Sequence, residues 1–336
     1  MKLLIFAQKI DVNDPVLGFF HRWVVEFSKK CESIIVICLY KGEYNLPNNV
    51  KVLSLGKENG ESKIKYILNL YKYIWNERKN YQSVFVHMNQ EYILLAGLFW
   101  RIFGKKIYMW RNHHAGNILT DIASFFCEKV FCTSKFSYTA KYSKTEIMPV
   151  GVDLEIFKPN DNIKRISKSI LSIGRISPSK SIHILVDVVK KINDQNIKVD
   201  VYGDPIPKDI QYYNELKEKA GSLINFYKGI PNTETVDVYS AHDIFVNLSS
   251  SGMYDKTIFE AMACGCIVIA SNDNLRGEIS DDLIFKQGDT DELKNKIVRV
   301  MNYSEKERLD ILSRINDFSN KHSFSILSDR LFKIIK

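Results

Sequence analysis

The chain has 336 residues, of which 45% are hydrophobic and 26% are charged. This length is too great for one ordinary hydrophobic core, so we predict two domains of roughly 150–170 residues each. No apolar run approaches the ~20 residues of a membrane-spanning helix, which argues against an integral membrane protein. The apolar stretch Leu3–Ala7 is too short for the core of a secretory signal peptide and fits a first buried strand.

The net charge of +8 is concentrated in the first half of the chain. Residues 1–155 contain 21 Lys and Arg against 14 Asp and Glu, a net charge of +7, and the remainder contains 26 against 25, a net charge of +1. This excess predicts an anionic partner for the first half, either phospholipid headgroups or a lipid diphosphate. We do not expect nucleic acid binding, because there is no dense Lys/Arg run and no recognised motif.

The cysteines and one basic helix indicate the cellular location of the protein. The six cysteines form no CxxC pair and lie in apolar segments, as small core residues do in a reducing compartment, so we expect a cytoplasmic protein. A helix predicted over residues 64–80 mixes cations with aromatic side chains. With Arg101, Lys105 and Lys106 it suits an anionic membrane surface on the inner membrane face, and an ordinary solvated helix face is the alternative.

Short apolar segments alternate with helical patterns through the first half of the chain. We predict strands over residues 2–7, 33–38, 50–55, 83–87 and 106–110. Helical patterns lie between most of them, over residues 19–31, 64–77 and 92–103. Strands that alternate with helices indicate a parallel, doubly wound sheet.

Two polar features follow strands of this first half. Gly18 precedes a helix after the first strand, which is a weak signal for a phosphate loop, with a simple turn as the alternative. His113 and His114 follow the fifth strand, and open α/β sheets bind ligands at the carboxyl ends of their strands. Adjacent side chains on a regular element point in different directions, so we expect one histidine, and not a metal-chelating pair, to have a site role.

The strand and helix pattern restarts after a linker over residues 157–162 that contains Pro, Asn and Asp. Three predicted strands of the second half end in glycine, which indicates a ligand close to the backbone. These glycines are Gly174, Gly203 and Gly229. Arg175 and Lys180 flank the first of these loops, and two cations there suit a diphosphate, with exposed charges as the alternative.

The stretch Ser249–Ser271 combines a loop of small residues, a short helical pattern and a buried apolar strand. A loop that leads amides and a lysine into a helix N-terminus is suited to phosphate, because unpaired N–H groups and the helix dipole favour an anion. Glu260 lies in that helix and is placed to accept hydrogen bonds from sugar hydroxyls. Thr257 and Glu260 also fit a capping box, in which Glu260 would only satisfy the helix's own amides.

Several motifs of other enzyme classes are weak or missing. Asp289-Thr290-Asp291 matches the DxD of metal–nucleotide sites, but it precedes a helical pattern and is explained more simply as a helix cap. We therefore predict no metal site. The sequence has no GxGxxG, GxxxxGK[ST] or GxSxG motif, which removes the main support for dinucleotide-binding, P-loop and α/β-hydrolase interpretations.

Two segments of the second half resemble motifs of the group 1 glycosyltransferases of family 4. They are Gly174-Arg175-Ile-Ser-Pro-Ser-Lys180, before an apolar helix, and Glu260-Ala-Met-Ala-Cys-Gly265-Cys-Ile-Val-Ile-Ala270. The tract Met148-Pro-Val-Gly151-Val-Asp153…Phe157 is similar to that family's domain-joining segment. The resemblance covers most of the chain, and in the first half it concerns layout more than motifs.

The resemblance implies an α/β protein with the GT-B fold, in which two facing Rossmann-like domains enclose an interdomain cleft. Residues 1–157 would form an acceptor-binding domain and residues 165–320 a nucleotide-sugar-binding domain. Residues 321–336 would form a C-terminal helix that packs back on the first domain. No cofactor is implied beyond the nucleotide diphosphate sugar itself, and no metal.

The resemblance also implies roles for individual residues. Arg175 and Lys180 would hold the diphosphate and stabilise it during catalysis, Glu260 would bind the donor's ribose, and His113 or His114 would face the reacting sugar. The implied donor-binding set is Gly18, Gly174, Arg175, Lys180, Gly203, Gly252, Met253, Asp255, Lys256, Thr257 and Glu260.

One position departs from the family pattern. The family has two glutamates separated by seven residues, and the position of the first one is occupied by Gly252. That glutamate contacts the transferred sugar in the family, so Asp255 or Lys256 would have to take its place, and the identity of the sugar stays open.

The expected function is transfer of a sugar, with retention of configuration, from a nucleotide diphosphate sugar to a glycan or lipid-linked glycan in surface polysaccharide biosynthesis. Two alternatives stay open at this point. One is a sugar-nucleotide epimerase of the same fold, which needs no external acceptor. The other is a catalytically silent subunit that binds a nucleotide sugar, which the glycine at position 252 makes conceivable.

Overall fold

The computed structural model describes residues 1–14 and 16–335, which divide into two compact units. The first unit comprises Met1–Met148 and the C-terminal residues from Leu327 onward, and the second comprises Pro149–Ile326. Residues 149–157, which we expected in the first domain, belong to the second unit because Val150, Val152 and Phe157 are buried in its core. None of the helices in the described ranges has both the length and the apolarity needed to cross a membrane.

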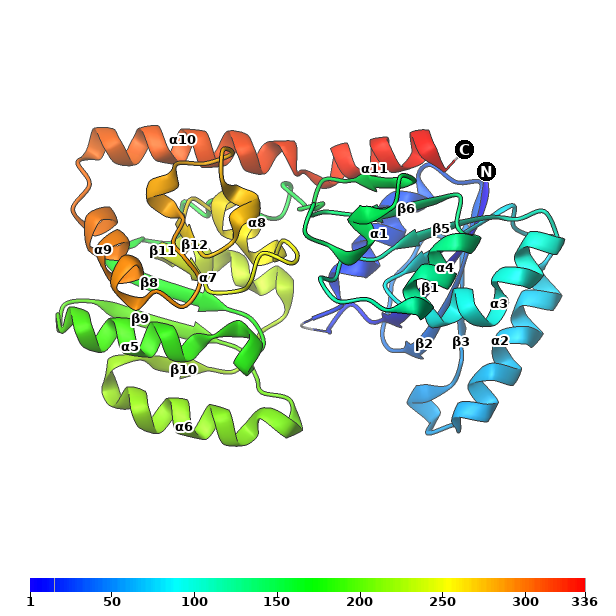
Figure 1. Cartoon of the computed structure of the whole chain (residues 1–336), viewed down its shortest axis with the longest axis horizontal. Helices are drawn as coiled ribbons and strands as arrows, with labels where there is room; N and C mark the ends of the chain where they lie inside the picture. The colour runs from blue at the N-terminus through cyan, green and yellow to red at the C-terminus, as the bar shows by residue number, and fades with distance from the viewer. Residues whose placement is uncertain (15, 336) are drawn as a thin grey trace. The chain divides into compact units, whose positions relative to one another are not determined.

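In the first unit, the described residues form a sheet of seven parallel strands in the order β3-β2-β1-β4-β5-β6-β7 (Figure 1). The strands are β1 (Lys2–Ile10), β2 (Ser33–Lys41), β3 (Val50–Ser54), β4 (Ser83–His87), β5 (Lys106–Trp110), β6 (Lys129–Cys132) and β7 (Thr145–Ile147). The five strands predicted for residues 2–110 are confirmed. Every residue of β4 is buried, as is typical of a parallel sheet with helices on both faces.

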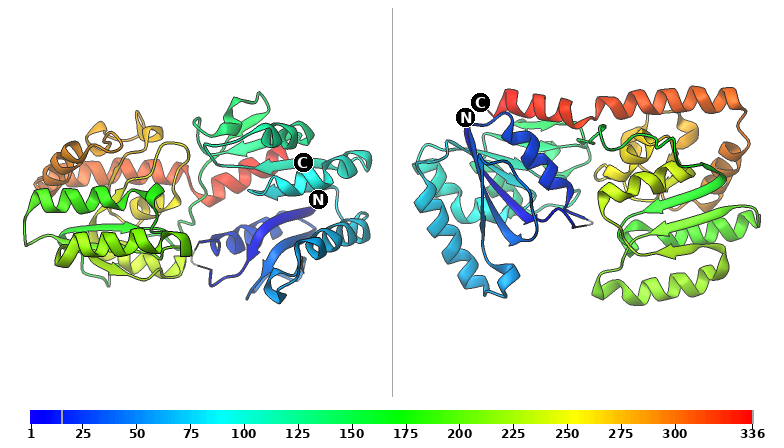
Figure 2. Two further views of the ribbon diagram at one scale, coloured as in Figure 1. Left: turned by 60° about the horizontal axis from the view of Figure 1, so that its bottom comes forward. Right: turned by 180° about the vertical axis from the view of Figure 1, so that it is seen from behind.

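Helices cover both faces of this sheet. Their bounds are α1 (Phe19–Ser28), α2 (Lys63–Glu77), α3 (Glu91–Ile102), α4 (Ile118–Phe126) and α11 (Phe324–Ile334). Buried side chains of α2, α3 and α4 share one hydrophobic cluster with residues of β1, β2, β4 and β5. On the other face, Phe27 of α1 packs against Phe85 of β4 and Phe332 of α11, with ring centroids 6.0 and 5.1 Å apart. Figure 2 shows the ribbons of α1 (dark blue) and α11 (red) on this face. The C-terminal helix thus completes the core of the first unit.

The second unit is built around a five-stranded parallel sheet in the order β10-β9-β8-β11-β12 within the part of the chain that is described. Its strands are β8 (Ile166–Ile173), β9 (Lys198–Tyr202), β10 (Asn225–Tyr227), β11 (His242–Asn247) and β12 (Ile267–Ala270). Its helices are α5 (Ile182–Ile192), α6 (Ile210–Ala220), α7 (Thr235–Ala241), α8 (Lys256–Ala263), α9 (Thr290–Met301) and α10 (Glu305–Lys321). Helix α5 packs against α6 and α9, and α8 packs against α7 and α10 (Figure 1).

The predicted cap at Asp289 is confirmed. Its side chain accepts hydrogen bonds from the backbone N–H groups of Asp291 and Glu292, at 3.1 and 2.9 Å, and so begins α9. The acidic first turn also suits the positive end of the helix dipole. Asp289-Thr290-Asp291 is therefore a helix start.

Candidate active site

The candidate site lies where the strand order of the second unit reverses. Strands β8 and β11 are neighbours, but the chain continues from β8 to β9 on one side and from β11 to β12 on the other. Open α/β sheets bind ligands at the carboxyl ends of the strands on either side of such a reversal. The two segments that follow these strands, residues 174–181 and 248–255, carry most of the predicted donor-binding residues.

Lys180 and Asp255, which are 75 residues apart in sequence, form an ion pair at this reversal. Lys180 Nζ lies 2.7 Å from Asp255 Oδ2 and 3.1 Å from Ser249 Oγ. The side-chain amide of Asn247, the last residue of β11, donates to the same carboxylate oxygen at 2.9 Å. The structure therefore brings two of the predicted residues together and adds Asn247 and Ser249 as partners.

The local backbone explains why Lys180 reaches this point. Residues Pro178–Lys180 form a 3-10 turn, and Ser181 has a left-handed conformation with φ of 52°. Helix α5 begins only after this kink, at Ile182. Lys180 consequently belongs to the loop after β8 rather than to the helix.

Burial of the Asp255 carboxyl by itself would raise its pKa. The ammonium of Lys180 opposes this effect, together with hydrogen bonds from Asn247, Lys180 and Ser249, and the net result is a pKa below the usual range. Asp255 is therefore ionised at neutral pH, and the pair with Lys180 carries no net charge.

Lys256 is the second lysine of the site and the first residue of α8. Its Nζ donates a hydrogen bond of 2.9 Å to the carbonyl oxygen of Gly151. Burial lowers the pKa of Lys256 to about 8, although the nearby carboxylates of Glu260 and Asp153 act in the opposite direction. An ammonium in so poorly solvated a position would gain from an additional anion.

Glu260 is buried, at 4% exposure, on the same helix as Lys256. Its carboxylate accepts hydrogen bonds from Asn232 Nδ2 at 3.1 Å and from the Tyr239 hydroxyl at 3.2 Å. Burial raises the pKa of Glu260, and the charge of Lys256 and these two hydrogen bonds partly offset the rise. The capping-box alternative is wrong, because α8 has Asp255 at its N-cap and no side chain caps it.

Residues 249–254, which we call the serine loop, lie before α8 and are held by residues that follow β12. Asn272 Nδ2 donates to the carbonyl oxygen of Met253 at 2.8 Å, and Asn274 Nδ2 donates to that of Ser251 at 2.7 Å. Gly252 and Thr257 are half-buried on either side of the Asp255 and Lys256 positions. The loop therefore has a defined path that places Asp255 and Lys256 at the helix start.

Glycines allow the loops after β8 and β9 to approach closely. Gly203 has φ of 156°, and a Cβ atom there would lie 1.9 Å from the carbonyl oxygen of Gly174. The loop after β9 can therefore pack on the loop after β8 only because residue 203 is glycine. At Gly174, whose φ is 150°, an added Cβ atom would have no described atom within 4 Å apart from its chain neighbours. Arg175 is exposed, and within residues 1–14 and 16–335 it forms no ion pair with Asp255 or Glu260.

The predicted residues of the first unit lie after β1 and β5. Gly18 is the N-cap residue of α1, and a Cβ atom there would lie 2.5 Å from the carbonyl oxygen of Asp14, so this close approach requires glycine. The rings of His113 and His114 stack with centroids 4.6 Å apart, which contradicts our expectation of divergent side chains. The reason is that they lie in a loop and not on a regular element; His113 Nδ1 also accepts from the N–H of Ala115 at 2.9 Å.

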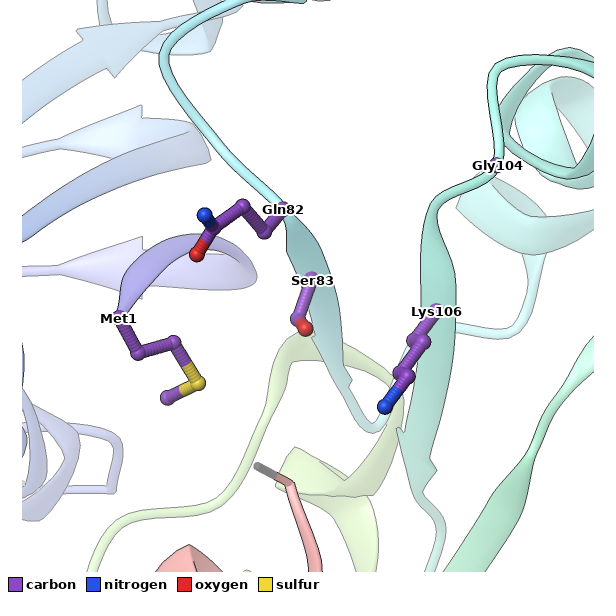
Figure 3. Close-up of a pocket in the computed structure, with 5 residues that line it drawn as sticks. All are labelled: Met1, Gln82, Ser83, Gly104 and Lys106. Atoms are coloured by element: carbon purple, nitrogen blue, oxygen red, sulfur yellow. The ribbon is translucent and has the colours of Figure 1, made fainter.

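A separate hollow of about 430 Å³ lies at the amino ends of the first unit's strands, opposite to the loops that carry Gly18, His113 and His114. Figure 3 shows its lining near the starts of β1, β4 and β5, formed by Met1, Gln82, Ser83, Gly104 and Lys106. Ligands of open α/β sheets bind at the carboxyl ends of the strands, and this hollow is at the amino ends. It is therefore not part of the candidate site.

Five residues of the site were not predicted as partners: Gly151, through its carbonyl oxygen, Asn232, Tyr239, Asn247 and Ser249. Asn247 had a usable signal, since it ends an apolar strand directly before the serine loop. Asn232 and Tyr239 come from the loop and helix after β10, and nothing in their local sequence connects them with Glu260.

Comparison with known proteins identifies the second unit. Residues 167–303 match the family model described as glycosyl transferases group 1. The chain is 30% identical over 189 residues to alpha-monoglucosyldiacylglycerol synthase of Streptococcus pneumoniae, covering 49% of this chain and 41% of the relative. It is 26% identical over 153 residues to D-inositol 3-phosphate glycosyltransferase of Kribbella flavida, covering 40% and 36% of the two chains. The chain thus spans less than half the length of these curated relatives.

Solved structures extend the likeness of fold to both units. The Anabaena protein HepE in complex with UDP and glucose aligns with a TM-score of 0.79 at 16% identity, over 99% of this chain and 98% of that one. Sucrose-phosphate synthase from Thermosynechococcus elongatus aligns with a TM-score of 0.78 at 15% identity, over 99% and 98%. The two Rossmann-like units of this chain therefore have the GT-B fold. Residues 167–303 of the second unit are similar to the group 1 glycosyl transferases.

Proposed function

We propose that this protein transfers a sugar, with retention of configuration, from a nucleotide diphosphate sugar to a glycan or lipid-linked glycan in surface polysaccharide biosynthesis. The observation that carries the proposal is the arrangement at the N-terminus of α8, beside the strand-order reversal of the second unit. Lys180 pairs with the N-cap residue Asp255, Lys256 is the first residue of α8, and Glu260 is buried one turn further along the helix. Two lysines beside a helix N-terminus suit a diphosphate, and a buried carboxylate suits ribose hydroxyls. The solved complexes of HepE with UDP and with UDP-glucose support a nucleotide-sugar donor.

In this proposal the diphosphate replaces Asp255 as the ion-pair partner of Lys180. The carboxylate keeps its hydrogen bond from Asn247, while Lys180, Lys256 and the exposed Arg175 face the phosphate oxygens. When the bond between the anomeric carbon and the phosphate oxygen breaks, negative charge grows on the departing nucleoside diphosphate. Preorganised cations and helix amides stabilise that charge more than they stabilise the bound donor, which is the source of the rate enhancement. The side-chain cations would do this without a metal ion.

The remaining assignments follow the family likeness. Gly18 would approach the diphosphate, and His113 or His114 would contact the reacting sugar. The cationic first unit would bind the acceptor, and we place the protein in the cytoplasm, peripherally at the inner membrane face. The glucolipid in the name of the pneumococcal relative is consistent with a lipid-linked acceptor.

The low pKa of Lys256 predicts how donor affinity depends on pH. Lys256 loses its proton as the pH rises through about 8, and a neutral amine attracts the diphosphate less. We expect the affinity for UDP to fall above pH 8 by up to about tenfold per pH unit, a limit set by release of one proton. Calorimetric titration of UDP between pH 7 and 9.5 measures this.

The matched variant for this pH dependence is Lys256→Arg, whose guanidinium stays charged throughout the range. Its UDP affinity should be nearly flat over the same pH interval. A wild-type affinity that does not change between pH 7 and 9.5 would remove Lys256 from the diphosphate site.

The test of the proposed function begins with thermal shifts of the full chain against nucleoside diphosphates and nucleotide sugars. A ligand at 100 times its dissociation constant stabilises the native state by about 2.7 kcal/mol, which is readily measured. The stabilising nucleotide sugar is then incubated with the protein and with glycan or glycolipid acceptors. We expect release of nucleoside diphosphate and a glycosylated product whose anomeric configuration by NMR equals that of the donor.

Two outcomes would redirect the proposal. Conversion of the nucleotide sugar into its epimer without any acceptor would assign the chain to the epimerases of this fold. Binding of the nucleotide sugar with neither transfer nor epimerisation, across the tested acceptors, would favour the silent binding subunit.

A further inference from the structure

Helices α2, α3 and α4 lie side by side on one face of the first unit's sheet. Trp75 of α2 packs against Phe99 of α3 with ring centroids 6.2 Å apart, and the Tyr71 hydroxyl donates to the carbonyl oxygen of Leu95 at 2.7 Å. On the other side of α3, a Cβ atom at Gly97 would lie 2.9 Å from the ring of Phe126, the last residue of α4. These contacts set α2, α3 and α4 in a row with α3 in the middle, and Figure 1 shows their ribbons.

Each of these helices has a second apolar stripe that faces solvent in addition to its buried one. In α2 the buried positions are Leu70 and Ile74, whereas Ile64, Leu68 and Trp75 are exposed. The most exposed apolar side chains of the surface are Ile64 (72%), Leu98 (64%), Ile102 (73%), Ile118 (71%) and Phe125 (74%). Single exposed apolar residues are ordinary, but a contiguous set across three helices marks an interaction surface. We call this surface the α2–α4 face.

Lysines are interleaved with the apolar residues of this face. Along α2 and the two residues after it, exposed residues recur every three or four positions and therefore share one side of the helix. They are Lys65, Leu68, Lys72, Trp75 and Lys79. Residues 63–106 contain eight Lys and Arg but only two acids, and one of the acids, Glu77, is buried and paired with Lys51 at 2.6 Å. Residues 107–126, which include α4, add one Arg and one Asp, and Arg101 is paired with Glu128 at 2.7 Å. The face is therefore apolar, and its positive charge lies mainly on the lysines of α2.

We propose that the α2–α4 face docks on an anionic phospholipid bilayer. Apolar side chains would enter the headgroup region, Trp75 and Tyr71 suit the boundary between headgroups and acyl chains, and the lysines would pair with lipid phosphates. A second copy of this chain fits the face less well, since a two-fold contact would place its lysines against one another. The docking rests on the proposed peripheral position at the membrane and would fail with it. It is distinct from donor binding, whose residues lie in the second unit, so the proposed sugar transfer can hold without it.

Co-sedimentation of the full chain with vesicles tests the docking. One vesicle type contains phosphatidylcholine with 30% phosphatidylglycerol, and the other contains phosphatidylcholine alone, a composition that lacks net charge. We expect binding to the anionic vesicles that weakens as NaCl is raised from 50 to 500 mM, because salt screens the lysines. Each lysine near the surface contributes about fivefold to the partition coefficient. The triple variant Lys65→Glu, Lys72→Glu, Lys79→Glu should therefore bind at least about a hundredfold more weakly.

A second variant removes the apolar part with Leu98→Ser, Ile102→Ser and Phe125→Ser, and it should also lose most of the binding. Matched controls carry the same changes on exposed residues of the second unit: Lys190→Glu, Lys228→Glu and Lys306→Glu for the charges, and Ile210→Ser, Leu223→Ser and Leu309→Ser for the apolar residues. Both controls should sediment like the wild type. Each variant is first shown to be folded by its melting temperature and by an unchanged thermal shift with UDP.

Three results would overturn the docking proposal. The first is a wild-type protein that does not sediment with anionic vesicles at 50 mM NaCl. The second is equal loss of binding in the control variants, which would indicate diffuse attraction to the whole protein. The third is a concentration-dependent dimer by analytical ultracentrifugation that the face variants abolish, which would assign the face to a second copy. A protein that binds vesicles but no nucleotide would instead contradict the proposed function alone.

Discussion

Replacing Lys180 by methionine is expected to lower kcat/KM for the nucleotide sugar by roughly 100- to 1000-fold. This is the usual effect of removing one preorganised group that stabilises charge in a transition state. The change should also lower the free energy of unfolding by about 1–3 kcal/mol, because the Asp255 carboxylate then keeps Asn247 but loses its counterion. Steady-state kinetics and urea unfolding measure the two effects separately.

A double variant separates the structural part of this result from the functional part. Lys180→Met with Asp255→Asn removes both charges while the side-chain oxygen of residue 255 can still accept from Asn247. We expect this variant to recover most of the lost stability and none of the lost activity. Recovery of activity together with stability would mean that Lys180 only neutralises Asp255. Lys191→Met serves as the control, since that lysine also forms an ion pair of 2.7 Å, with Asp291, on the surface of the same unit.

Changes at Glu260 are expected to have the second large effect. Glu260→Gln should lower kcat/KM by about 10- to 100-fold through a weaker hold on the donor, while the melting temperature stays within a few degrees of the wild type. The reason is that glutamine has the same shape, can still accept from Asn232, and avoids burying a charge. Glu260→Ala should in addition lower the free energy of unfolding by about 2–4 kcal/mol, because Asn232 and Tyr239 both lose their acceptor.

Asp200 provides the control for these changes. It is also a buried carboxylate of the second unit, paired with His242 at 3.0 Å in the middle of β9. Asp200→Asn should destabilise the protein and leave the KM for the donor unchanged. If Glu260→Gln also changed stability but not KM, the carboxylate would be a structural group like Asp200, and the ribose assignment would be wrong.

The residues around Lys180 show which groups are present in the site where the family's first glutamate is replaced by Gly252. Asp255 and Lys256 were the residues expected to take over its contact with the sugar. In the structure both are already held by protein groups, Asp255 by Lys180 and Asn247, and Lys256 by the carbonyl of Gly151. If the proposed donor binds here, it would exchange contacts with the protein, and we expect its sugar to be selected by how well it repeats the hydrogen bonds it displaces.

The sequence by itself determined the architecture. Buried parallel strands are continuous apolar runs bounded by turns, and the amphipathic helices between them have a different period. Local pattern therefore placed β1–β5, β8, β9, β10 and β12 with small errors at their ends. It also determined the cap at Asp289, because a helix cap is made within four residues. The motifs of residues 174–180 and 260–270 indicated, in the same local way, the likeness of the second unit to group 1 glycosyl transferases.

Only the tertiary structure decided which groups meet. Lys180 pairs with Asp255 because β8 and β11 are neighbours in the sheet although β9 and β10 lie between them in the chain. The same holds for Glu260, whose partners come from the segment before β11. The exposed stripes of α2, α3 and α4 likewise become one face only when the sheet sets the helices side by side. Local propensity follows from neighbouring residues, whereas a site depends on strand order, and strand order is fixed by packing of the whole sheet.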